Sequence, residues 1–168
     1  SNKNLVFLGM MGSGKSSIGN LISKKLNIPF IDIDNLIVKN VEMSISEIFE
    51  KKGESYFRNL EEKITLKSLK KIKNVISLGG GAFINTNIRK EILTNHFSFW
   101  LKWDESTLIK RIKNSKKRPL AFKSTDDEIK TIIKDRSRIY KKAQFKINCN
   151  KLTKNEILQK IIEIYELN

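Results

Sequence analysis

Eight residues near the N-terminus carry the strongest chemical signal in the chain. The stretch Gly9-Met-Met-Gly-Ser-Gly-Lys-Ser16 matches the phosphate-binding pattern G-x-x-x-x-G-K-[ST] at each fixed position. In this pattern the glycines let backbone N–H groups face phosphate oxygens, Lys15 reaches the β- and γ-phosphates, and Ser16 offers its hydroxyl to Mg²⁺. We therefore expect a nucleoside triphosphate with Mg²⁺ to bind through this loop, with these residues: Gly9, Gly12, Ser13, Gly14, Lys15, Ser16 and Ser17. The loop alone leaves the acceptor open, because a GTPase or motor uses water and a small kinase uses a hydroxyl group.

Two carboxylates follow the second apolar run of the chain. Asp32 and Asp34 flank Ile33, so we expect their side chains to leave opposite faces of a strand that extends to this point. In phosphoryl transfer one carboxylate is expected near Mg²⁺, and a second can accept the proton of an acceptor hydroxyl. The pair therefore favours a kinase, without assigning which residue takes which role.

Three glycines, Gly79, Gly80 and Gly81, follow the third apolar run. Glycine in series costs conformational entropy, so a triplet suggests a place where a ligand approaches bare backbone. Such backbone can present N–H groups to an anionic or polyhydroxylated acceptor.

Arginine is rare in this lysine-rich chain, which favours a geometric role where it occurs. Six of the 33 basic residues are arginine, and a guanidinium group can bind a carboxylate or phosphate through two parallel hydrogen bonds. Arg58 and Glu61 lie three residues apart on a predicted helix, so Glu61 can hold the guanidinium in place. Arg118 precedes Pro119 at the end of a polar stretch, and Arg136 lies on the long helix that follows.

The elements that must position these residues alternate between strand and helix. Apolar runs predict strands at residues 4–9, 29–34, 74–78, 97–103 and 145–149, and helical periodicity predicts helices at 15–26, 44–52, 54–71, 87–95, 104–113, 125–143 and from 153 onward. This alternation predicts an α/β fold, a three-layer αβα arrangement with a five-stranded parallel sheet. Ligands of such sheets bind beyond the carboxyl ends of the strands, where the phosphate loop, the aspartates and the triplet all fall. Trp100 and Trp103 are interpreted as packing residues.

Composition narrows the class of protein. A chain of 168 residues fits one domain, and no apolar run reaches the length of a membrane span. The formal net charge of +15 raises the hypothesis of nucleic-acid binding, but lysine is spread along the whole chain and no basic stripe carries interleaved aromatics. We therefore expect no nucleic-acid partner and no membrane association. The single cysteine, Cys149, cannot form an internal disulfide and no signal peptide is recognisable, so we expect a cytoplasmic protein. We also expect a monomer.

In combination, these motifs resemble those of the shikimate kinases. The matching residues run in order along the chain: Gly9 to Ser16, Asp32-Ile-Asp34, Phe57-Arg58 with Glu61, Gly79 to Gly81, Arg118-Pro119-Leu120, and Arg136 four residues before Tyr140. The resemblance implies phosphorylation of shikimate to shikimate 3-phosphate by ATP with Mg²⁺, in aromatic amino-acid biosynthesis. It also implies the P-loop kinase fold with a lid at about residues 113–124 and an acceptor-binding region at about 33–61.

The resemblance also implies individual roles. Lys15, Asp34 and Arg118 would be catalytic, with Asp34 at the reacting hydroxyl and Arg118 reaching the transferring phosphate from the lid. Ser16 and Asp32 would serve Mg²⁺, Asp32 through water. The shikimate site would consist of Asp34, Arg58, Gly79, Gly80, Gly81 and Arg136, with the two arginines on the carboxylate. Arg111 would pack on the adenine, and Asn150 lies where the family contacts the base.

Other functions stay open at this point. Another small-molecule P-loop kinase, for gluconate or a nucleoside monophosphate, would share most of these features, because gluconate also carries a carboxylate. A GTPase switch would need an Asn/Thr-Lys-x-Asp motif, which we do not find in the sequence.

Overall fold

A five-stranded, all-parallel sheet forms the centre of the molecule. The computed structural model describes residues 1–115 and 124–168. The strands are β1 (Leu5–Leu8), β2 (Phe30–Asp32), β3 (Val75–Ser77), β4 (Phe97–Lys102) and β5 (Phe145–Asn148), in the spatial order β2-β3-β1-β4-β5. β1 pairs with β3 on one side and with β4 on the other. The connections after β1 run to one side of it for β2 and β3 and to the other side for β4 and β5. In such folds, ligands usually bind at the carboxyl end of the strand where this change of side occurs.

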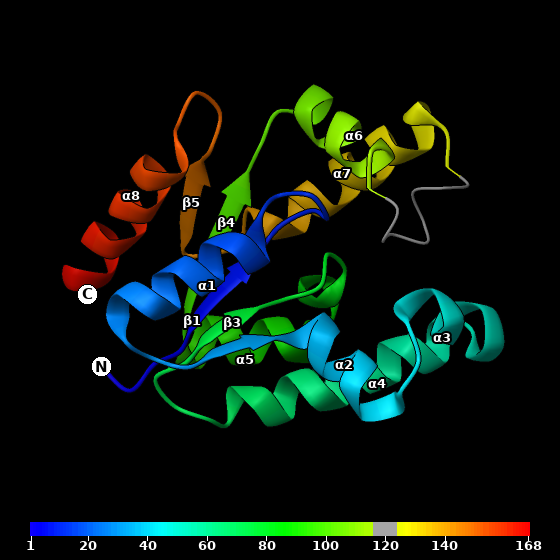
Figure 1. Cartoon of the computed structure of the whole chain (residues 1–168), viewed down its shortest axis with the longest axis horizontal. Helices are drawn as coiled ribbons and strands as arrows, with labels where there is room; N and C mark the ends of the chain where they lie inside the picture. Colours follow the sequence, from blue (N-terminus) through cyan, green and yellow to red (C-terminus); the bar gives the residue numbers. More distant parts are fainter. Residues whose placement is uncertain (116–123) are drawn as a thin grey trace.

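Helices cover both faces of this sheet (Figure 1). Within the described residues they are α1 (Lys15–Leu26), α2 (Ile33–Val41), α3 (Ile45–Lys52), α4 (Glu54–Leu69), α5 (Thr86–Asn95), α6 (Glu105–Lys113), α7 (Asp126–Tyr140) and α8 (Lys154–Glu166), with a short 3₁₀ turn at Ala82–Ile84. This architecture confirms the α/β fold expected from the sequence.

Alternation along β1 divides the core between the two faces. Leu5 and Phe7 pack with residues of α1 and α8 on one face, and Val6 and Leu8 pack with residues of α4, α5 and α7 on the other. All four side chains are buried, because a strand with helices on both sides has no solvent-facing side. The rigid central strand fixes the point at which the phosphate loop begins.

The chain after β2 differs from the sequence-based expectation. The strand ends at Asp32, and Asp34 lies in the first turn of α2 rather than on a continued strand. Asp32 is the N-cap of α2, and its carboxylate accepts the backbone N–H of Asn35 at 3.1 Å. The prediction of opposite strand faces was therefore wrong: the strand stops at Asp32, whose carboxylate satisfies a free N–H group at the start of α2.

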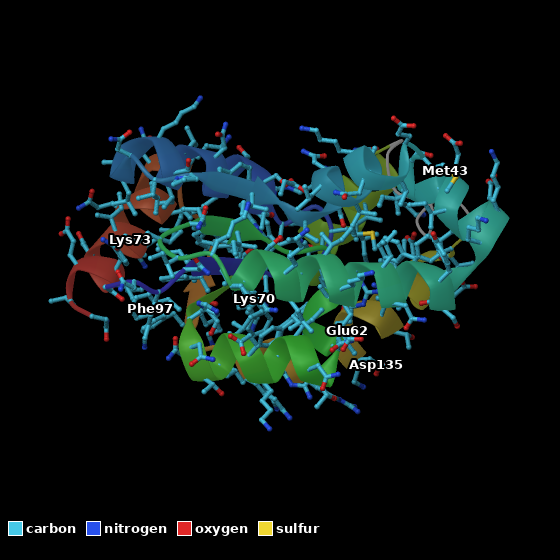
Figure 2. The ribbon with its side chains drawn as sticks, turned by 90° about the horizontal axis from the view of Figure 1, so that it is seen from below. Met43, Glu62, Lys70, Lys73, Phe97 and Asp135 are labelled. Atoms are coloured by element: carbon cyan, nitrogen blue, oxygen red, sulfur yellow. The ribbon has the colours of Figure 1, made fainter. Side chains whose placement is uncertain are left out.

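The strands of the sheet begin at one end of the molecule and stop at the other. Figure 2 places Lys73 and Phe97, which precede or begin strands, at the opposite end from Met43, which follows α2. The functional residues lie toward the latter end, where the strands stop. Among the described residues, no helix combines the length and apolar composition that a bilayer span requires.

Candidate active site

The phosphate loop joins β1 to α1. Gly14 is the N-cap of α1, with φ at 83°, a left-handed conformation that favours glycine. Lys15 is buried, and its Nζ donates to the carbonyl oxygens of Gly9 and Met10 at 2.8 and 2.9 Å. The loop thus holds its lysine beside the N-terminus of a helix, where anions are stabilised.

Two side chains that follow β4 in the chain hold the backbone carbonyls of this loop. Trp103 Nε1 donates to the Ser13 carbonyl at 2.8 Å, and Arg111 Nη1 donates to the Gly12 carbonyl at 3.1 Å. The Arg111 guanidinium stacks on the Trp103 ring, with Cζ 3.9 Å from the ring centroid. Trp103 therefore does more than the packing role that the sequence suggested, since it fixes the backbone of the phosphate loop.

Ser16, the second residue of α1, lies beside two further side chains that carry oxygen atoms. Ser16 Oγ donates to Asp32 Oδ2, and Ser77 Oγ lies 3.5 Å from Ser16 Oγ. Asp32 and Ser77 are register partners on β2 and β3, so the sheet itself sets their spacing. One carboxylate and two hydroxyls form a hard oxygen set of the kind that Mg²⁺ prefers together with phosphate oxygens.

Asp34 faces the glycine triplet from the start of α2. A Cβ added to Gly79 would lie 2.7 Å from Asp34 Oδ1 and 3.1 Å from Glu61 Oε2. A side chain at this position would therefore have to displace the two carboxylates from the backbone. The structure brings Asp34 and the triplet together, as the expected acceptor site requires.

Arg58 is held by carboxylates on its own helix. Its Nη1 lies 2.9 Å from Glu61 Oε1, and its Nε lies 3.6 Å from Glu54 Oε1. Glu61 is 2% exposed, and this burial raises the pKa of its carboxyl group, with the Arg58 guanidinium acting in the opposite direction. A Cβ on Gly81 would lie 2.5 Å from Arg58 Nη1, so the guanidinium rests against bare backbone.

Arg136 approaches the same triplet from α7. A Cβ on Gly80 would lie 3.2 Å from Arg136 Nη1 and 3.3 Å from the backbone nitrogen of Met11 in the phosphate loop. Arg136 Nη1 is buried and has no hydrogen-bond partner among the residues that the structure describes. A buried guanidinium N–H group of this kind suits an anionic ligand.

These residues line one cleft of about 570 Å³. Its polar wall contains Ser16, Asp32, Asp34, Arg58, Glu61, Gly79, Gly80, Gly81 and Arg136, and its apolar wall includes Met11, Val38, Ile45, Phe49 and Phe57. Two guanidinium groups, together with carboxylates from α2 and α4, thus surround a space that opens onto the phosphate loop. The arrangement can bind a small carboxylate that also bears hydroxyl groups.

Two predicted nucleotide-binding residues, Asn150 and Ser17, do not line this cleft. Asn150 Oδ1 accepts the backbone N–H of Asp104 at 2.8 Å and so joins the loops after β4 and β5. Lys154 Nζ donates to Ser17 Oγ at 3.0 Å. Arg118 and most of the predicted lid, residues 116–123, lie outside the described residues.

The sequence assigned no role in the active site to three residues that contact it. Tyr140 donates its hydroxyl to the Gly80 carbonyl, Trp103 holds the Ser13 carbonyl, and Ser77 approaches Ser16. Their partners lie 60, 90 and 61 residues away in the chain. Of the three, only Tyr140 carried a signal, its position one helical turn after Arg136.

Comparisons with known proteins identify the family of the chain. A model of the shikimate kinase family matches residues 11–166. A shikimate kinase of Thermodesulfovibrio yellowstonii is 39% identical over 165 residues, which cover 98% of this chain and 95% of the relative. The structure of the Aquifex aeolicus shikimate kinase is similar with a TM-score of 0.85 and 36% identity, covering 97% of this chain and 96% of that one.

A second solved structure extends the comparison to a complex. It is the shikimate kinase of Acinetobacter baumannii in complex with shikimate, with a TM-score of 0.93 and 26% identity, covering 100% of this chain and 95% of that one. The family match and the near-complete coverage of relatives more than 30% identical lead to one conclusion: this chain belongs to the shikimate kinase family.

Proposed function

We propose that this chain transfers the γ-phosphoryl group of ATP to a hydroxyl group of shikimate, using the residues that line the cleft beside the phosphate loop. Membership of the family makes the chain a kinase with shikimate as acceptor and ATP as co-substrate. The observation that carries the residue assignment is the position of Gly80 between Arg136 and the backbone of Met11. Gly80 therefore lies where the acceptor cleft meets the phosphate loop.

The acceptor would bind by its carboxylate and its ring hydroxyls. Arg58 and Arg136 would hold the carboxylate, because both guanidinium groups line the cleft and planar forks bind carboxylates through paired hydrogen bonds. Glu61 would keep Arg58 in place through the 2.9 Å contact. The bare backbone of the triplet would let the ring lie close to the chain.

The metal would be held where oxygen ligands already gather. Ser16 and Asp32, with Ser77 beside them, fit Mg²⁺ because hard cations take oxygen ligands and Mg²⁺ needs few of them from the protein when phosphates supply the rest. When bound, Mg²⁺ neutralises charge on the β- and γ-phosphates. Among the described residues, no cluster of three or more His, Cys, Asp or Glu side chains suited to a metal is found.

The reaction would be an in-line displacement. The acceptor oxygen forms a bond to the γ-phosphorus as the bond from that phosphorus to the bridging oxygen of ADP breaks, and the acceptor proton passes to the Asp34 carboxylate. Lys15 stays with the β- and γ-phosphates and stabilises the negative charge that develops on them. Most of the rate gain in such a site comes from positioning and preorganised charge. We further propose that residues 113–124 act as a lid over the nucleotide, with Arg118 reaching the transferring phosphate and Arg111 packing on the adenine.

A coupled ADP-release assay tests this function. The purified chain is assayed with ATP and Mg²⁺ against shikimate, quinate, gluconate and the nucleoside monophosphates, and we expect shikimate to give the highest kcat/KM. Lys15→Met is the control: it should fold but lose turnover by at least about 10²–10³-fold, the cost of removing one key electrostatic group. Higher kcat/KM with gluconate or a nucleoside monophosphate would contradict the proposal.

A further inference from the structure

Tyr140 is a buried tyrosine whose hydroxyl contacts the acceptor cradle. The side chain is 1% exposed, and its ring lies 5.9 Å from that of Trp100 on β4. Its hydroxyl donates to the carbonyl oxygen of Gly80 and lies 3.8 Å from Met10 Sδ in the phosphate loop. One hydroxyl thus contacts the middle glycine of the triplet and approaches the loop that binds the nucleotide.

The bond matters because of where it falls in the backbone. The Gly80 carbonyl and the Gly81 N–H belong to one planar trans peptide unit, so they point in opposite directions. Holding the carbonyl toward Tyr140 therefore directs the Gly81 N–H away from it, and Gly81 lines the acceptor cleft. A peptide between two glycines has no Cβ on either side to restrain its rotation, so it can turn over at low cost. Such a peptide needs an external anchor to keep one orientation.

Tyr140 also belongs to the helix that supplies Arg136. The two residues are four apart at the end of α7 and so lie on one face of the helix. Arg136 Nη1 approaches the Cα side of Gly80, and Tyr140 holds the carbonyl of the same residue. The last turn of α7 therefore contacts Gly80 through both side chains.

We propose that Tyr140 is a positioning residue for the acceptor: its hydroxyl anchors the Gly80–Gly81 peptide and so keeps the triplet and Arg136 in the arrangement that binds shikimate. This inference rests on the proposed function, because it assigns Tyr140 to the same acceptor site. Tyr140 acts through Gly80, not on the reacting atoms. Burial raises the pKa of the Tyr140 hydroxyl to about 12, so the group keeps its proton and stays a donor through the working pH range.

Kinetics of Tyr140→Phe test the role, since this change keeps the ring against Trp100 and removes only the hydroxyl. We expect KM for shikimate to rise about 5-fold, the equivalent of one hydrogen bond, while KM for ATP changes by less than about 2-fold. The binary Kd for shikimate, measured by calorimetry, should rise in parallel. Tyr140→Met, which fills similar space without a hydroxyl, gives the same test if the phenylalanine variant does not fold.

Phe99→Leu serves as the matched control for a purely structural role. Phe99 is fully buried on the opposite face of the sheet, stacked on Phe7 at 5.4 Å. Its replacement should lower the melting temperature without separating the two KM values. An unchanged KM for shikimate in the Tyr140 variants, or an equal rise for ATP, would overturn the inference. Absence of shikimate turnover in the unmodified chain would instead overturn the proposed function.

Discussion

Gly81→Ala gives a sharp test of the acceptor site, because the structure predicts a clash with a single functional group. The new Cβ would lie 2.5 Å from Arg58 Nη1, 2.7 Å from Nη2 and 2.8 Å from Cζ. Ordinary contact begins at about 3.4 Å, so the guanidinium has to move away. The backbone itself accepts alanine, since φ at Gly81 is −98°.

The size of the effect follows from what the displaced guanidinium loses. A guanidinium displaced in this way no longer reaches the carboxylate of bound shikimate. Hydrogen bonds to charged groups contribute about 1.5–3 kcal/mol. We therefore expect KM for shikimate to rise by about 10- to 100-fold. The contact with Glu61, now 2.9 Å, should also break. KM for ATP should stay within about 2-fold, because the atoms nearest the added Cβ all belong to Arg58.

The assay is steady-state kinetics with shikimate and ATP varied in turn, with thermal denaturation alongside. Alanine restricts the unfolded chain and so favours folding slightly, but loss of the contact between Arg58 and the buried Glu61 opposes this gain, so thermal denaturation serves to show that the variant is still folded. Arg58→Ala provides the upper limit of the shikimate effect. An unchanged KM for shikimate in Gly81→Ala, or a parallel rise for ATP, would show that Arg58 does not hold the acceptor from this position.

Three further changes probe other parts of the molecule. Burial raises the pKa of Glu61, so on acidification this carboxyl group should take up its proton at a higher pH than an ordinary glutamate and release Arg58. In pH profiles of the unmodified chain, KM for shikimate should therefore rise as the pH falls. In Glu61→Gln, KM for shikimate should already be high and should change much less with pH. Trp103→Phe removes the donor to the Ser13 carbonyl, so KM for ATP should rise about 3- to 10-fold with little change for shikimate. Thr153→Ala removes the capping box of α8 and should lower the free energy of unfolding by about 1 kcal/mol in chemical denaturation; an unchanged midpoint would show that the cap contributes nothing.

Local patterns explain why much of the fold could be predicted. The helix expected at residues 15–26 is α1 with the same bounds, because its amphipathic period and the glycine before it are both local features. The helix expected from residue 153 onward is α8, and its start is also set locally, by a capping box between Thr153 and Glu156. Where two local patterns competed, the prediction failed. The run of residues 29–34 indicated a strand as far as Asp34, but Asp32 caps α2 and Asp34 lies in that helix. An N-cap and a strand end share the same extended backbone, so the sequence alone could not separate them.

The sequence by itself determined which chemistry the chain carries, because the phosphate loop is contiguous and its function depends on residues next to one another. It also pointed to the acceptor groups by type: paired aspartates, a glycine triplet and scarce arginines. Only the tertiary structure decided how these groups meet, through contacts such as Arg136 with Gly80, or Tyr140 with the Gly80 carbonyl. Those contacts join segments about 60 residues apart in the chain, and side-chain identity carries no local signal for a partner that only the packing of α7 against the sheet brings near.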